Sequence, residues 1–311
     1  MAEWLYEAGI GEDRAAMVEN GAIIAARVAP HDLAPRLGTV LPARLIEKGH
    51  MPRVALDGGG EAVLAHLPPG ITLGAALSVE IVREAIPEAR RPKLPKATPS
   101  DAAPAPGPDL RAEIAASGIG VRQMLPHQPD ALEAAGWSEL LEEAATGEIA
   151  FPGGALRMAV TPAMTLFDVD GDGDPAKLAI AAAGAVARAI QRMDIGGSIG
   201  VDFPTLANKT ERSAAAEAFD AAMPQPFERT AVNGYGFLQI IRPRRRASLP
   251  ELLAADPAGA EARALLRCVE RAPPPGVAIE RVPAGMILAL KPEWIAELHR
   301  RTGTPTRFDA S

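Results

Sequence analysis

Four aspartates, Asp168, Asp170, Asp172 and Asp174, alternate with other residues in the sequence FDVDGDGDP. Carboxylates this close together repel one another unless a cation or several backbone donors offset their charge. Mg²⁺ and Ca²⁺ are natural partners for such a group, because both ions prefer oxygen ligands. The segment therefore predicts a site for a divalent cation.

One interpretation of these aspartates is a calcium loop of the EF-hand type. Residues 168–173 match its D-x-D-x-D-G opening. The twelfth position of such a loop carries a bidentate glutamate, but in this chain it is Ala179. The residues before the loop also favour a strand rather than a helix, so the sequence disfavours this interpretation.

A second interpretation follows from the predicted elements around the aspartates. Strands are predicted over 156–160 and 163–169, an Ala-rich helix over 175–193 with Asp174 as its N-cap, and another strand over 198–203. If this β-α-β unit places its strands side by side, Asp168 and Asp202 lie at the same sheet edge.

Two carboxylates at one sheet edge suit Mg²⁺, which keeps several waters and leaves room for a phosphate oxygen and an attacking hydroxide. That layout is typical of phosphodiester hydrolysis. The structural alternative is that Asp202 caps the next segment and that Asp170–Asp174 merely solvate a turn. The spacing of the residues leaves both alternatives open.

The remaining elements indicate several units. Paired strands are predicted over residues 1–36, and short strands from 38 to 82 favour a small barrel, for which an OB-fold is the commonest choice and a small β-sandwich the alternative. The Pro- and Ala-rich segment near 98–108 is typical of a semi-rigid linker. The tail has helical patterns over 249–271 and 292–301 around a strand-like segment, VPAGMILAL.

Composition bounds the class of protein. The 311 residues are 48% hydrophobic and 23% charged, which is typical of a globular chain, and no apolar run is long enough for a membrane helix. The acidic N-terminus does not indicate export, so a cytoplasmic protein is predicted. The net charge of −7 argues against nucleic-acid binding by bulk positive charge, but two local basic clusters lie at 83–96 and 242–246.

Three segments together resemble the ribonuclease E/G family. They are FPGGALRMAVTPAMTLFDVD (151–170), RMDIGGSIGVDF (192–203) and NGYGFLQIIRPRRRASL (233–249), and they follow one another in the family's order. The likeness is strong over 148–249 and weaker over the rest of the chain.

The resemblance implies a mixed α+β fold. An RNase H-like subdomain over 1–36 plus 109–148 would hold an inserted OB-fold barrel over 37–98, with a linker at 99–108. A DNase I-like α/β catalytic subdomain over 149–250 and a small C-terminal domain over 251–311 would follow.

The resemblance also implies a site. Asp168 and Asp202 match the family's two Mg²⁺ ligands, and Asp170 stands at a catalytic position where the family has asparagine, a change that could favour Mn²⁺. Arg242 and Arg244 match basic positions after the catalytic strands, and Lys93 lies near a lysine that contacts RNA.

Several family features are missing. Ala55 and Val63 stand where the barrel carries base-stacking phenylalanines. The zinc-linking cysteine pair is absent, since Cys268 is the only cysteine and reads as a small core residue, so neither zinc nor a zinc-linked dimer is expected. Most of the segment that senses RNA 5′ ends is also absent.

The resulting hypothesis is a compact, Mg²⁺-dependent endoribonuclease acting on single-stranded RNA in RNA processing or decay. The alternative is a non-catalytic RNA-binding protein on the same scaffold.

Overall fold

The computed structural model describes residues 1–88, 92–273 and 276–310, and its contacts divide the chain into two compact units. The first unit joins Met1–Leu33, Leu110–Ser138 and Leu252–Ser311. The second unit joins Ala34–Asp109 and Glu139–Glu251. The tail that the sequence predicts as a separate domain therefore shares a unit with the N-terminal strands.

A four-stranded sheet forms the centre of the first unit. Its order is β3-β2-β1-β9, antiparallel except that β1 and β9 run parallel. The strands are β1 (Glu3–Ala8), β2 (Glu12–Glu19), β3 (Ala22–Pro30) and β9 (Val121–Gln123). Trp4 and Tyr6 on one face of β1 pack with Leu110 and Ile114 of α1 (Leu110–Ala115), so the three predicted N-terminal strands are confirmed.

The C-terminal helices pack around Trp294, which shares a core with Ile10 and Leu266. The helices that contribute to this core are α7 (Pro257–Glu270), α8 (Ala284–Ala289) and α9 (Pro292–Thr302). The chain also forms α2 (Ala131–Ala134), α6 (Leu249–Ala255) and the parallel pair β16 (Ile279–Val282) and β17 (Arg307–Ala310).

Two expectations for this tail are wrong. The segment predicted as a strand over 282–290 is mainly helix α8, because Ala, Met and Leu are good helix formers and Met286 and Leu290 pack in the same core. Cys268 is exposed, since α7 turns its apolar stripe of Ala262, Leu266 and Val269 inward and leaves Cys268 outside that stripe.

The second unit contains the predicted small barrel. Five strands close it in the order β4-β5-β6-β8-β7, which is consistent with an OB-like barrel. They are β4 (Val40–Glu47), β5 (Arg53–Leu56), β6 (Glu61–Leu64), β7 (Ala76–Arg83) and β8 (Lys96–Pro99). Residues such as Leu45, Val54 and Ile81 alternate inward and are completely buried.

Strand β8 closes the barrel although the sequence does not predict it. It pairs parallel with β6 and antiparallel with β7. The following segment, predicted as a linker over 99–108, lies against the barrel: Ala105 exchanges backbone hydrogen bonds with Val40, both at 2.9 Å, and Gly107 N donates to Thr39 Oγ1 at 3.0 Å. Its prolines are accommodated because only a few of its backbone groups pair with the barrel.

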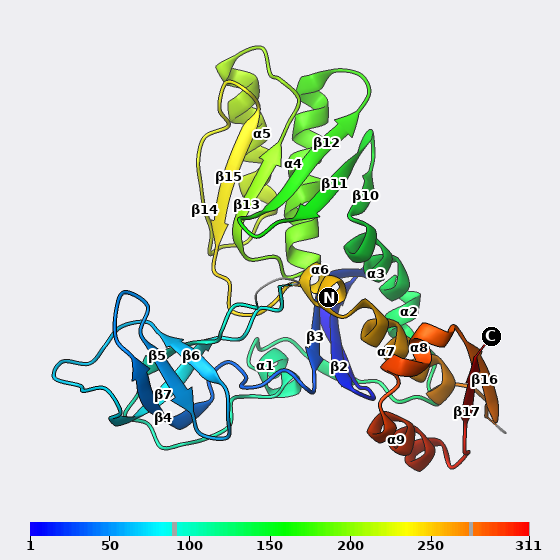
Figure 1. Cartoon of the computed structure of the whole chain (residues 1–311). Coiled ribbons are helices and arrows are strands. Elements are labelled where there is room, and N and C mark those ends of the chain that lie inside the picture. The colour runs from blue at the N-terminus through cyan, green and yellow to red at the C-terminus, as the bar shows by residue number, and fades with distance from the viewer. Residues whose placement is uncertain (89–91, 274–275, 311) are drawn as a thin grey trace. The chain divides into compact units, whose positions relative to one another are not determined.

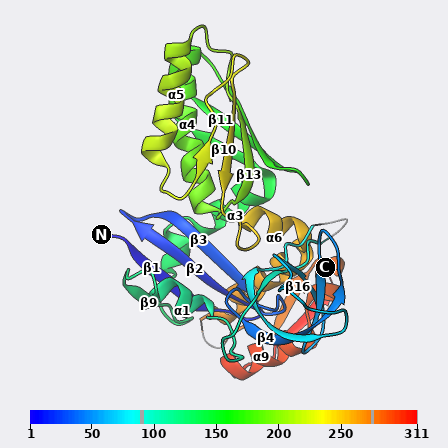
Figure 2. The same ribbon diagram turned by 90° about the vertical axis from the view of Figure 1, so that its left-hand side faces the viewer.

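A six-stranded sheet completes the second unit, in the order β10-β11-β12-β13-β15-β14. Its strands are β10 (Glu148–Phe151), β11 (Gly154–Val160), β12 (Thr165–Gly171), β13 (Gly197–Asp202), β14 (Glu228–Arg229) and β15 (Phe237–Arg242). Helices α4 (Pro175–Arg192) and α5 (Lys209–Ala222) cover one face, as Figures 1 and 2 show from two directions, and α3 (Trp137–Thr146) precedes β10.

Helix α4 begins where the sequence predicts. Asp174 Oδ1 accepts a hydrogen bond from Ala176 N at 2.9 Å, and Pro175 occupies the first helical position. The helix ends at Arg192, and Gly197, with a φ of +89°, is the first residue of β13. None of the described helices combines the length and apolar composition needed to cross a membrane.

Candidate active site

Asp168 and Asp202 lie side by side on neighbouring parallel strands. Strands β12 and β13 pair in parallel, and their register places Asp168 directly opposite Asp202. Neighbouring strands are separated by about 4.8 Å, and opposite residues in a ladder project from the same face. The sequence-based prediction that these two aspartates meet at one sheet edge is confirmed.

The two carboxylates are exposed on the face away from α4. Phe167 and Val201, their chain neighbours, are buried on the helix-covered face, so alternation turns the aspartates to the open face. Within the described ranges, neither Asp168 nor Asp202 has a hydrogen-bond or ion-pair partner. Two adjacent, unpaired anions are best offset by a cation.

This donor set fits magnesium. No group of three or more His, Cys, Asp or Glu side chains among the described residues is arranged to hold a metal ion, so the site offers two carboxylates. Mg²⁺ is commonly bound by one or two carboxylates, with waters and substrate phosphates completing its octahedron. Asp168 and Asp202 would hold such an ion.

Asp170 has a different environment from the pair. It lies two residues after Asp168 on the same strand, and its Oδ2 atom is 3.1 Å from Arg157 Nη1 on β11. That oxygen is shielded from solvent and accepts no hydrogen bond from the described residues. Arg157 therefore offsets the charge that Asp170 adds at the position predicted to be catalytic.

The calcium-loop interpretation is contradicted. Asp168 and Asp170 lie inside β12, which pairs with β11 through Gly171. An EF-hand loop presents these positions in a turn around the ion, whereas a strand sends every second side chain to one open face.

Arg242 does not lie beside the aspartates. Strand β15 runs antiparallel to β13, so that Phe237 is opposite Asp202 and Arg242 is opposite Gly197. The length of β13 therefore separates Arg242 from Asp202 by roughly 17 Å. Arg242 Nη1 donates to Ile195 O at 2.9 Å and lies 3.5 Å from Asp194 Oδ1. Arg242, which the resemblance places among the basic positions after the catalytic strands, is therefore carried by the antiparallel register to the end of the sheet opposite the aspartates.

Lys93 and Arg244 do come together, around Glu88. Lys93 Nζ is 2.6 Å from Glu88 Oε1, and Arg244 Nη2 is 3.8 Å from the same oxygen. Arg244 also pairs with Glu251. The structure thus brings two of the predicted RNA-binding residues to one place, at the other end of the sheet from the aspartates. Arg90 and Arg91 of the same basic cluster lie outside the described residues.

An exposed aromatic side chain that no sequence motif singles out lies at the aspartate edge. Tyr235 is 87% exposed, on the turn before β15. Asn233 Oδ1 accepts hydrogen bonds from Tyr235 N and Phe237 N at 2.8 and 3.0 Å, and Gly236 O accepts from Phe203 N at 3.2 Å. The turn is therefore fastened to the strand end that carries Asp202. The dipeptide Asn233-Gly234 is typical of a turn, but no local pattern indicates that this turn lies beside Asp202.

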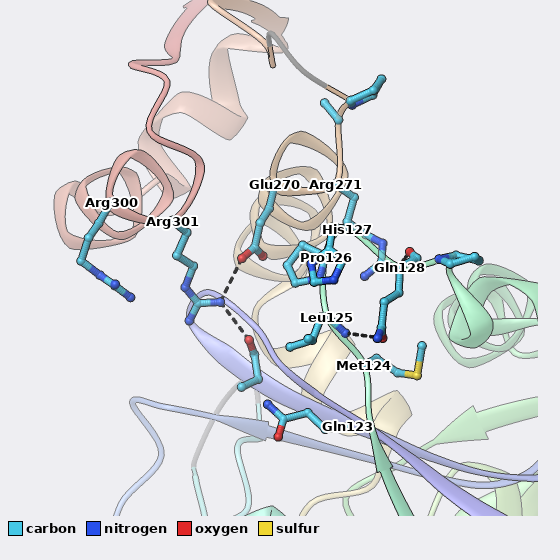
Figure 3. A pocket seen from close by; sticks show the side chains of 14 residues that line it. Gln123, Met124, Leu125, Pro126, His127, Gln128, Glu270, Arg271, Arg300 and Arg301 are labelled. Carbon is cyan, nitrogen blue, oxygen red and sulfur yellow. Dashed lines mark hydrogen bonds and ion pairs between the residues drawn. The ribbon is translucent and has the colours of Figure 1, made fainter.

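A cavity of about 900 Å³ lies elsewhere, in the first unit. Figure 3 shows its lining, from residues 123–129 and the ends of α7 and α9. Its charged groups are already engaged: Arg301 Nη1 is 3.1 Å from Glu270 Oε1, and Arg271 Nη2 donates to Gln128 O at 3.0 Å. The cavity therefore lacks the unpaired acids that mark the aspartate edge.

No protein-family model matches the chain, and no curated protein matches its sequence.

Proposed function

We propose that the chain is a metal-dependent endoribonuclease of the ribonuclease E/G type that cleaves single-stranded RNA at the edge carrying Asp168 and Asp202. The observation that carries this proposal is the direct pairing of two exposed carboxylates with no partner among the described residues. Exposed carboxylates need no partner one at a time, but two of them opposite each other in one ladder repel, and a cation between them offsets that repulsion.

In this mechanism Asp168 and Asp202 would hold Mg²⁺, or Mn²⁺ as the alternative, and the bound ion would supply Lewis-acid chemistry at the scissile phosphate and activate a water for attack. Asp170, whose charge Arg157 partly offsets, lies two residues from Asp168 on the same strand and is the third acid of the proposed site. Lys93, Arg242 and Arg244 hold the RNA backbone at a distance from the bond that breaks.

The test uses purified protein and a labelled single-stranded RNA, with and without Mg²⁺ or Mn²⁺, beside the Asp202→Asn variant. Metal-dependent cleavage that disappears in the variant is the expected result. Cleavage of equal rate in wild type and variant would come from a contaminating nuclease and would overturn the proposal.

A second candidate is an RNA-binding protein without turnover. The ion pair between Arg157 and Asp170 favours it, because Asp170 replaces the asparagine of the family pattern and its charge is partly neutralised. RNA binding that weakens with salt, without cleavage at any divalent ion, would identify this function.

A further inference from the structure

Two arginines from distant parts of the second unit lie near each other. Glu84 N donates to Arg245 O at 2.8 Å, which joins the end of β7 to the segment after β15. In the sequence, Arg83 directly precedes Glu84 and Arg244 directly precedes Arg245. Arg83 Nη2 donates to Leu94 O at 2.7 Å, on the segment that carries Lys93. Three cations, from Arg83, Lys93 and Arg244, therefore gather where these segments meet.

The acids nearby do not balance these cations. Arg244 and Lys93 share Glu88, and Arg244 also pairs with Glu251. Arg83 has no carboxylate within ion-pair distance among the described residues. The next residue, Glu84, forms no ion pair with a described cation; its Oε1 accepts a hydrogen bond from Leu37 N at 3.0 Å.

Burial makes the imbalance costly. The Nε atoms of Arg83 and Arg244 are shielded from solvent and have no hydrogen-bond partner among the described residues. Burial lowers the pKa of Arg83, repulsion from Arg244 lowers it further, and Glu88 offsets only part of this. A partly buried cation whose near neighbour is another cation is stabilised by an added anion.

We propose that Arg83, Lys93 and Arg244 form a phosphate-binding site, filled by a backbone phosphate of the RNA. Guanidinium groups suit this ligand because their fork of N–H donors matches two phosphate oxygens, and the lysine adds a point charge. That the phosphate belongs to RNA is inferred from the proposed function. That the site prefers a phosphate group is inferred from the three clustered cations.

The position of the cluster defines its role. Arg244 follows Arg242, which is opposite Gly197 at the far end of β13 from Asp202. Contacts remote from the reacting bond hold substrate and transition state equally, so they change KM rather than kcat. The site therefore anchors the strand and takes no part in the cleavage step.

The experiment measures RNA affinity apart from cleavage. Arg83→Gln is made in the full chain carrying Asp202→Asn, and binding of a labelled single-stranded RNA is followed by fluorescence anisotropy in EDTA at several KCl concentrations. We expect affinity to fall about 3- to 10-fold and the slope of log Kd against log salt to drop by about 0.7, as for one lost phosphate contact.

The matched control is Arg53→Gln, on the same barrel. Arg53 is half-buried and pairs with Glu47 and Glu61, so its loss should change neither affinity nor slope. Arg83→Lys keeps the charge, and it should restore the salt slope if the charge rather than local packing is responsible. Thermal unfolding of each variant establishes that it is folded.

A second arm identifies the source of the phosphate. Inorganic phosphate should raise the Tm of the wild type more than that of Arg83→Gln. Phosphate protection with unchanged RNA affinity would overturn the RNA assignment and make a free phosphate ester the ligand. Equal behaviour of Arg83→Gln and Arg53→Gln in both arms would overturn the site. Because binding is measured without metal, failure of the wild type to cleave RNA would overturn the proposed nuclease activity and leave the phosphate-binding site untouched.

Discussion

Each unit of the molecule places acidic residues on strands of a sheet, with opposite results. In the first unit, Glu7 on β1 is only 4% exposed and is surrounded by guanidinium groups. Its carboxylate lies 3.6 Å from Arg14, 2.9 Å from Arg267 and 3.0 Å from Arg271. In the second unit, Asp168 and Asp202 are exposed and have no partner among the described residues.

Solvation accounts for this contrast. A carboxylate taken out of water must be paired, because its desolvation costs several kcal/mol. In the first unit, arginines recur every fourth residue along α7 and at its C-cap, and each pairs with an acid. Arg263 pairs with Glu12, Arg267 with Glu7 and Arg271 with Asp130. The open face of the second sheet imposes no such requirement. The buried acids of the first unit form ion pairs that stabilise the fold, whereas the exposed aspartates of the second unit are available to bind a ligand.

The sharpest test of this comparison is Asp202→Asn. We expect metal-dependent RNA cleavage to fall on the order of 1,000-fold, because one of two charged metal ligands is lost. Stability should stay within about 0.5 kcal/mol of wild type, as for other exposed positions. Single-turnover cleavage and urea unfolding measure the two effects; a large loss of stability would mean that Asp202 is structural.

The reverse pattern is expected for Glu7→Gln. Removing this charge leaves three partly or fully buried arginines short of a partner, so the free energy of unfolding should fall by about 3 kcal/mol. Urea unfolding checks this. The control is Glu3→Gln, because Glu3 forms an exposed pair with Arg122 at 2.9 Å, and its loss should cost less than about 1 kcal/mol. Equal effects of the two changes would contradict the contrast between the regions.

Tyr235→Ala should weaken RNA binding about 5- to 10-fold. The exposed ring, on a turn fastened beside Asp202, offers a face on which one base can stack. Anisotropy in EDTA measures the change, and Tyr235→Phe, which keeps the ring, should bind like wild type. If Tyr235→Ala and Tyr235→Phe bind RNA with equal affinity, the ring of Tyr235 does not contact RNA.

The smallest effect is a pH dependence at Glu297. Hydrogen bonds from Arg300 and then Arg301 lower the pKa of Glu297 from its usual 4.5 to about 2. A lowered pKa in the folded state contributes stability above pH 4.5 that is lost as the pH falls towards 2. Glu297→Gln should therefore be less stable at pH 7, by under about 1 kcal/mol for this solvent-screened pair, and match wild type near pH 2.

Urea unfolding of both proteins across this pH range measures the difference. A constant difference at all pH values would mean that packing, not charge, explains the loss.

Local sequence determined most elements and the candidate pair. The alternation in β12, the Asp174 cap and the helix between two strands sufficed to predict that Asp168 and Asp202 meet, because a β-α-β unit aligns the ends of its strands. The three glycines 58–60, all with positive φ, are likewise a local signal for the tight turn between the antiparallel strands β5 and β6.

Tertiary structure decided the remaining features. β8 was missed because four residues flanked by prolines show no period, and they form a strand only where β6 and β7 accept them. The separation of Arg242 from Asp202 depends on the antiparallel register of β13 and β15, which no local pattern specifies. The gathering of Arg83 with Arg244, about 160 residues away in the chain, and the pairing of Glu7 by α7 arise from long-range packing. Local patterns specify which residues share a strand face or a helix end, whereas the solvation and partners of a charge depend on what folds over it.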